Sequence, residues 1–193
     1  VPFDYAPFRQ AAALLYDGPW VAERLAAVEG FIATNAADFD PTVRGIIEGA
    51  RKYSAVDAFN GLYALNGFRQ QVAPVWRDCD MLLLPTSPTT CTVAEMLADP
   101  VARNSQFGRY TNFANLMGLA AIAVPAGFGP SGLPAGVTLV GPGFSDAALA
   151  PFAAAMHAAA GCGMGRDTAA ALPAAPSSVC PEGWQQIAVV GAH

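Results

Sequence analysis

Short apolar runs that stop at a proline restrict the fold of this sequence more than any other feature. MLLLP ends at Pro85, and LAAIAVP ends at Pro125. A membrane-spanning helix needs about 18 consecutive apolar residues, so runs of this length predict buried strands and argue against a membrane protein. Segments with helical periodicity separate them. The sequence therefore predicts an α/β fold in which a sheet is covered on both faces.

The chain is more apolar than a typical soluble domain. Of its 193 residues, 53% are hydrophobic and only 13% are charged, so we expect further polypeptide to cover part of its surface. The net charge of −5 comes without a basic stripe, so no nucleic-acid partner is expected. No secretion signal is visible. Free thiols in the cytoplasm are therefore favoured over the alternative, a disulfide between Cys162 and Cys180.

Composition divides the chain into three regions. Residues 1–162 alternate helical and strand patterns, and we expect them to form one domain portion. Residues 163–186 are rich in Ala, Pro, Ser and Gly, which is typical of a linker. The final IAVVGAH, residues 187–193, is interpreted as the first strand of a further domain.

A Tyr and an Arg flank a turn near the N-terminus, in LLYDGPWVAER. Asp17 is a suitable cap and Pro19 a suitable first residue for a helix over 19–33. Arg24 then lies at the edge of the apolar face of this helix. Capping-box patterns at Ser54 and Thr92 predict two further helix starts.

Residues that usually carry catalysis are scarce. Lys52 is the only lysine, and the two histidines, His157 and His193, adjoin no GxSxG motif. No phosphate-binding loop and no metal-ligand spacing is present. The spacing of residues therefore predicts no self-contained active site and no metal site.

Five segments of the chain together resemble the amidase signature family. They are AALLYDGPWVAERLAAV, RKYSAVDAFNGLYAL, DMLLLPTSPTT, ADPVARNSQFGRYTNFANLMGLAAIAVPAGF and GLPAGVTLVGP. LLYDGPWVAER and NSQFGRYTNF are similar in particular to the members that hydrolyse allophanate. The resemblance covers about residues 3–160. It implies a mixed β-sheet flanked by helices, a partial amidase signature fold, in a cytoplasmic amide hydrolase of urea or cyanuric acid breakdown.

The resemblance also implies that the catalytic residues lie outside this chain. The family uses a Lys and a bridging Ser to activate a nucleophilic Ser, with backbone N–H groups as the oxyanion hole. Here no Gly-Ser-Ser-Gly run occurs, Lys52 does not match the triad lysine, and Ser177-Ser178 lies in the linker. The C-terminal part of an amidase domain is thus expected, with the missing N-terminal half as its partner, in a homodimer without a cofactor.

Tyr16 and Arg24 match the substrate-binding Tyr and Arg that the resemblance implies. Arg reads a planar carboxylate with a bidentate fork, and Tyr offers a hydrogen-bonding group in an apolar wall. An alternative is that Arg24 pairs with a buried acid and Tyr16 is a core ring. Weaker substrate-contact candidates are Thr86, Ser87, Asn104, Thr111, Asn112 and Asn115.

Two other interpretations of function remain open from the sequence. The protein could be another amidase signature enzyme, such as a general amidase or the A subunit of a tRNA-dependent amidotransferase. The LLYDGPWVAER segment argues against this interpretation. The chain could also be a non-catalytic scaffold fragment, and we expect residues 1–193 alone to be inactive.

Overall fold

A computed structural model describes residues 1–164, 167 and 169–171. The expected strand at 187–193 and most of the expected linker lie outside the described residues. The described α-helices are α1 (Ala6–Ala13), α2 (Val21–Asn35), α3 (Pro41–Glu48), α4 (Ala55–Val72), α5 (Val75–Asp78), α6 (Val93–Ala98), α7 (Pro100–Phe107), α8 (Asn112–Met117) and α9 (Asp146–Ala160). Short 3₁₀ helices are η1 (Ala36–Asp38), η2 (Gly49–Lys52) and η3 (Gly108–Tyr110), and the strands are β1 (Leu82–Pro85), β2 (Ala120–Phe128) and β3 (Pro134–Gly141).

The three strands form an antiparallel sheet in the order β1-β3-β2. β2 and β3 are a hairpin, and β1 pairs with the far side of β3, with Leu82 opposite Val140. The predicted strands are confirmed, although β2 continues beyond Val124. An irregularity between Pro125 and Phe128 lets it do so, and Gly127 there has a φ of 106°.

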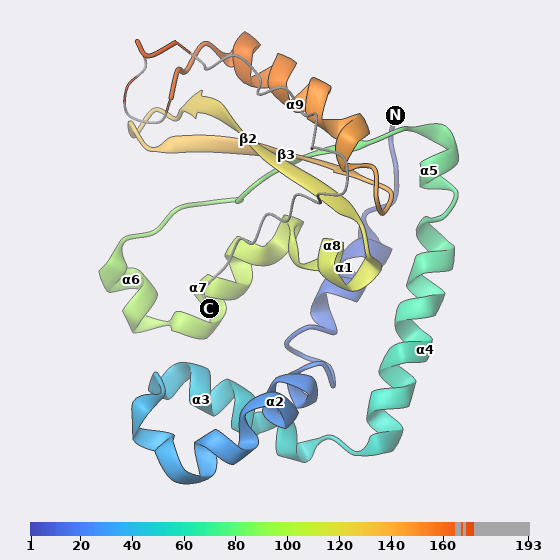
Figure 1. The fold of residues 1–193 in the computed structure, drawn as a ribbon, viewed down its shortest axis with the longest axis vertical. Helices are drawn as coiled ribbons and strands as arrows, with labels where there is room; N and C mark the ends of the chain where they lie inside the picture. The colour runs from blue at the N-terminus through green and yellow to red at the C-terminus, as the bar shows by residue number, and fades with distance from the viewer. Residues whose placement is uncertain (165–166, 168, 172–193) are drawn as a thin grey trace, which may run out of the picture.

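Apolar side chains cover both faces of this sheet, as the buried runs predict. α9 lies across one face, where Leu149 packs with Leu139 and Val124 (Figure 1). On the other face, Leu82 and Val140 pack against α1 and α8 in a cluster that includes Phe8, Leu84, Phe113, Leu116 and Met117. The cover of the sheet is partial, since Leu83 on β1 is 54% exposed. α1, which leads to Tyr16, packs against α4 and α8 in the cluster that lies on this second face.

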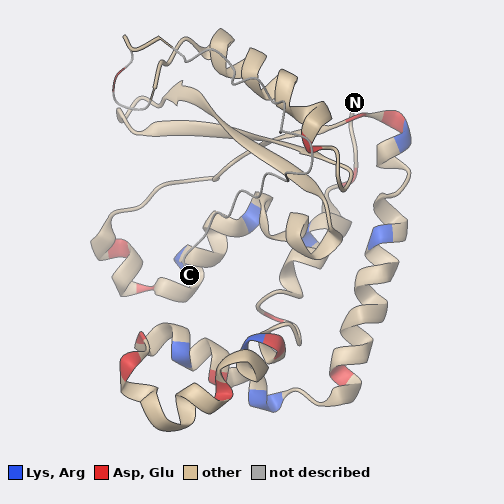
Figure 2. Cartoon of the chain, in the orientation of Figure 1, with Lys and Arg blue, Asp and Glu red and all other residues tan. Residues whose placement is uncertain are grey.

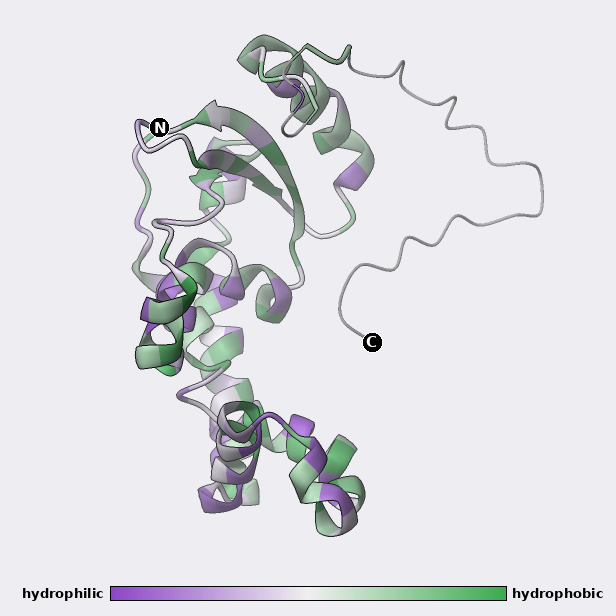
Figure 3. Cartoon of the chain, turned by 90° about the vertical axis from the view of Figure 1, so that its left-hand side faces the viewer, coloured by the Kyte–Doolittle hydropathy of each residue, from purple (hydrophilic) through white to green (hydrophobic). Residues whose placement is uncertain are grey.

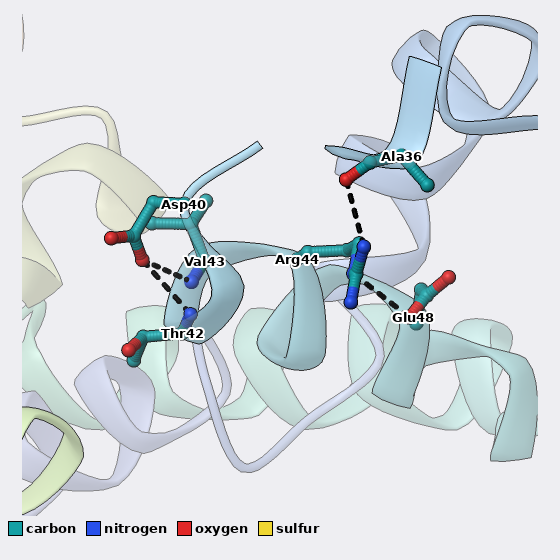
Figure 4. A network of polar contacts seen from close by, with 6 residues as sticks. All are labelled: Ala36, Asp40, Thr42, Val43, Arg44 and Glu48. Carbon is teal, nitrogen blue, oxygen red and sulfur yellow. Dashed lines mark hydrogen bonds and ion pairs between the residues drawn. The ribbon is translucent and has the colours of Figure 1, made fainter. Parts of the chain in front are cut away.

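A second apolar cluster joins α2, α3 and η2. Its buried members are Val21, Leu25, Ile32, Ile47 and Ala50. The first three come from α2 and form the apolar face expected for that helix. Asp40 caps α3 by accepting hydrogen bonds from the backbone of Thr42 and Val43, and Arg44 donates to the Ala36 carbonyl at 2.7 Å (Figure 4). This cluster fixes the helix that carries Arg24.

Both predicted capping boxes are present. Asp57 N–H donates to Ser54 Oγ at 3.2 Å, and Ser54 N–H donates to the Asp57 carboxylate at 2.8 Å. The Ser54 side-chain hydrogen bond lowers the pKa of the Asp57 carboxyl. Thr92 and Glu95 form the same arrangement before α6. These local signals depend on four residues each, which explains why the sequence shows them.

Asp17 does not cap α2, which corrects the prediction for this helix. α2 begins at Val21, and Trp20 precedes it without a side-chain cap. The Pro19 and Trp20 carbonyls accept the first N–H groups, from Ala22 and Glu23. Within the described part of the chain, no helix has both the length and the apolar character needed to cross a membrane.

Candidate functional site

The turn between α1 and α2 places Tyr16 beside Arg24. Asp17 N–H donates to the Ala13 carbonyl at 2.8 Å, so the chain turns tightly as α1 ends. Gly18 is required at this turn, because a Cβ there would lie 2.6 Å from the Leu14 carbonyl oxygen. The turn brings the first part of α2 back toward the ring of Tyr16.

Two segments distant in sequence hold this turn in place. The Tyr53 hydroxyl donates to the Asp17 carbonyl at 3.1 Å. On α4, a Cβ at Gly61 would lie 2.6 Å from Pro19 Cγ, so the absence of a side chain lets the turn approach the helix. The turn is thus wedged between α4 and the residue that follows η2.

The Arg24 guanidinium stacks over the ring of Tyr16, with its central carbon 4.9 Å from the ring centroid. Both residues are half-buried. Among the described residues, Arg24 has no acidic partner, since the ion pairs found there are Arg44–Glu48 and Arg51–Glu29. A half-buried guanidinium without a carboxylate can accept one from a ligand. The alternative of an Arg24 ion pair with a buried acid finds no support in this geometry.

Tyr16 and Arg24 line different hollows although they touch. Tyr16 forms part of the wall between hollows of about 650 and 590 Å³, which lie on either side of α7 residue Ser105. Arg24 lines a hollow of about 450 Å³ between α2, α4 and α8. In the described residues the two side chains therefore do not open into one pocket, and they meet at a shared edge.

The weaker polar candidates are distributed among these hollows. Asn112 lines the 650 Å³ hollow, Asn104 the 590 Å³ hollow, and Asn115 the hollow of Arg24. Thr111 is half-buried before α8 and lines none of the three. Thr86 and Ser87 line a separate hollow beside the β2–β3 hairpin, where Thr86 Oγ1 lies 2.8 Å from Thr138 Oγ1.

Two cations that the sequence did not indicate share the 650 Å³ hollow with Tyr16. Arg9 comes from α1 and Arg109 from η3, so only the fold brings them together. Tyr5 ties the two elements by donating to the Arg109 carbonyl at 2.6 Å, and burial raises the pKa of Tyr5 to about 12. The neutral phenol is therefore the form that this hydrogen bond requires.

The residues that could have catalytic chemistry have local contacts instead. Lys52 Nζ lies 4.9 Å from the centre of the Tyr53 ring, and His157 Nε2 lies 3.0 Å from the Gly163 carbonyl oxygen. No group of three His, Cys, Asp or Glu residues in the described ranges could hold a metal ion. The described residues show no assembled nucleophile and base.

A family model described as Amidase matches residues 14–150. Urea amidolyase from Lachancea kluyveri is 48% identical over 151 residues, which are 77% of this chain and 8% of that protein. The solved structure of Kluyveromyces lactis allophanate hydrolase has a TM-score of 0.79 and 44% identity, over 83% of this chain and 26% of that one.

A third relative is named for a different activity. A glutamyl-tRNA(Gln) amidotransferase component from Corynebacterium diphtheriae is 34% identical over 150 residues, or 73% of this chain and 29% of that protein. The chain thus spans less than a third of the length of each of these relatives.

Proposed function

Because this chain belongs to the amidase family, we propose that the protein containing it hydrolyses allophanate to ammonia and N-carboxycarbamate. The observation that carries the proposal is the half-buried Arg24, which stacks on Tyr16 and has no carboxylate partner in the described chain. The identity of 48% to a urea amidolyase and 44% to an allophanate hydrolase supports this substrate over others.

Arg24 and Tyr16 would act in substrate recognition. Allophanate is a small planar urea-like amide with a carboxylate at one end. With its face on the Tyr16 ring, the Arg24 guanidinium keeps its N–H edge available for a bidentate bond to that carboxylate. The Tyr16 hydroxyl, which has no hydrogen-bond partner among the described residues, would contact the substrate beside it.

The chemical step would come from the part of the amidase domain that the relatives have and this chain does not span. There, a Ser activated through a Lys and a second Ser would attack the terminal amide carbonyl and expel ammonia. Water would then release N-carboxycarbamate from the acyl-enzyme. The role proposed for the present chain is to bind the carboxylate end of the substrate, so that the terminal amide carbonyl lies against that nucleophile.

The biological setting of the proposal is nitrogen release from urea or cyanuric acid, by a cytoplasmic homodimer. The 48% identical relative is named urea amidolyase, and this name supports the urea route. The dimer and the compartment rest on family resemblance, and sedimentation of the complete protein would test the dimer.

Ammonia release by the complete protein tests the proposed activity. Allophanate, glutamine and simple aliphatic amides should be compared at equal concentration, and we expect turnover of allophanate to exceed that of the others. Preferred turnover of glutamine would instead favour the amidotransferase-type activity named for the 34% identical relative. Preferred turnover of simple amides would favour a general amidase.

A further inference from the structure

Phe144 combines an unfavourable backbone with a fully exposed ring. It lies in the turn between β3 and α9, and it is the one non-glycine residue of the described chain with a positive φ, at 65°. Its side chain is 103% exposed relative to an extended reference. A bulky residue is disfavoured in the left-handed region, and a solvated phenyl ring gains nothing in return.

The residues around Phe144 fix its outward direction. A Cβ at Gly143 would collide with the Gly118 carbonyl, and a Cβ at Gly141 would lie 2.5 Å from Ser145 Oγ. Ser145 N–H also donates to the Pro142 carbonyl at 3.2 Å. Because the turn is packed tightly against the start of β2, Phe144 cannot fold back onto the sheet without displacing it.

The surface next to Phe144 is apolar. α9 carries no Lys, Arg, Asp or Glu after Asp146 at its first position, and Figure 2 shows the helix as an uncharged segment. Phe152 on α9 is 54% exposed, and Figure 3 shows α9 as predominantly hydrophobic. A helix that is apolar on all sides is typical of a covered position.

We propose that Phe144 is a docking residue for the portion of the amidase domain that the relatives contain and this chain does not span. The family match includes Phe144, and the allophanate hydrolase structure is matched over only 26% of its length. A second copy is the alternative occupant, and the dilution series described below distinguishes it from the rest of the domain. This inference rests on family membership and not on the choice of substrate.

Urea unfolding of the complete protein tests the docking. The test compares substitutions at residue 144 that differ in their preference for a positive φ. Phe144→Asn and Phe144→Gly suit a positive φ but remove the ring, whereas Phe144→Leu keeps an apolar side chain and the unfavourable backbone. If the ring is buried, the urea midpoint should fall in the order Phe, Leu, then Asn and Gly. If Asn and Gly equal or exceed Phe, the backbone preference dominates and the docking is refuted.

Chemical labelling provides a second measurement that does not depend on the energetics. In Phe144→Cys, maleimide labelling of residue 144 is followed by peptide mass spectrometry, with Gln71→Cys on the exposed side of α4 as the matched control. We expect residue 144 to react ~10-fold or more slowly than residue 71 in the native protein. Equal rates would overturn the proposal, and a rate that rises on dilution would assign the contact to a second copy.

Neither measurement uses allophanate. A protein that is protected at residue 144 but inactive on allophanate would retain this inference and lose the proposed substrate. A protein active on allophanate but freely labelled at residue 144 would retain the proposed substrate and lose this inference.

Discussion

Arg24 lies with its guanidinium over the ring of Tyr16, 4.9 Å from the ring centroid, across a turn of Asp-Gly-Pro-Trp. A cation–π contact of this kind stabilises by about 0.5–2 kcal/mol, depending on desolvation. It also restrains the plane of the guanidinium. In the proposed site, this restraint orients the N–H fork before the substrate arrives.

Arg24→Lys should lower kcat/KM for allophanate by ~10-fold or more in the complete protein. Lysine keeps the charge but loses the planar fork, and ~1.4 kcal/mol of transition-state binding corresponds to a factor of ten. Arg51→Lys is the matched control, because Arg51 forms an exposed ion pair with Glu29 at 2.7 Å. Steady-state kinetics that are the same for both variants would remove Arg24 from the site.

Tyr16→Phe separates the two proposed roles of the phenol. The ring, and so the stacking with Arg24, is retained while the hydroxyl is lost. We expect nearly unchanged stability and a several-fold lower kcat/KM, whereas Tyr16→Ala should lose more of both. An unaltered kcat/KM in Tyr16→Phe would mean that only the ring matters, as a support for Arg24.

Gly18→Ala should destabilise the protein by about 1–3 kcal/mol, because the new Cβ would meet the Leu14 backbone at 2.6 Å. Gly30→Ala is the opposite case. Gly30 lies inside α2, and a Cβ added there would have no other atom within 4 Å, so its replacement should stabilise by about 0.5–1 kcal/mol. Urea unfolding of both variants measures the difference, and equal effects would contradict the close approach at the turn.

The raised pKa of Tyr5 predicts a loss of stability at alkaline pH. Burial raises its pKa from 10.0 to about 12, so the unfolded chain ionises first. The stabilisation is fully present below pH 10 and is lost as the pH rises toward 12. Tyr5→Phe should therefore flatten the fall of the urea midpoint between about pH 10 and 12.

Tyr63→Phe is the control for that measurement, because Tyr63 is 68% exposed on α4. Tyr63→Phe should leave the fall of the urea midpoint at alkaline pH unchanged. A fall as steep in Tyr5→Phe as in the wild type would show that the Tyr5 phenol does not cause it.

The isolated chain of residues 1–193 should release no ammonia from allophanate, since the described residues bring no nucleophile and base together. Ammonia should appear with the complete protein under the same conditions. Turnover by the isolated chain would place the catalytic residues within it and refute the division of the site proposed above.

Local sequence patterns predicted the parts of this fold that depend on neighbouring residues. The capping boxes at Ser54 and Thr92 and the buried strand at Leu82 need only a few adjacent side chains to specify them. Asp17 was wrongly predicted as a cap, because the turn uses its peptide N–H and carbonyl groups instead.

The features that sequence reasoning missed depend on contacts between distant segments. The juxtaposition of Arg9 with Arg109 is set by how α1 packs against η3. The approach of Pro19 to Gly61 is set by how the turn after α1 packs against α4. The residue types at these positions have no distinctive spacing. Only the Tyr16–Arg24 pair is close in sequence, and for that reason the family segment could indicate it.

The strand order β1-β3-β2 has a consequence for synthesis on the ribosome. Within the described sheet, β1 obtains its hydrogen-bond partner only from β3, which is made long after β1 has left the ribosome's active centre. At about 5–20 residues per second, β1 would stay unpaired for several seconds. During that interval the nascent chain exposes an apolar strand, so slow codons between Pro85 and Pro134 would prolong the period in which it is vulnerable to aggregation and in need of a chaperone.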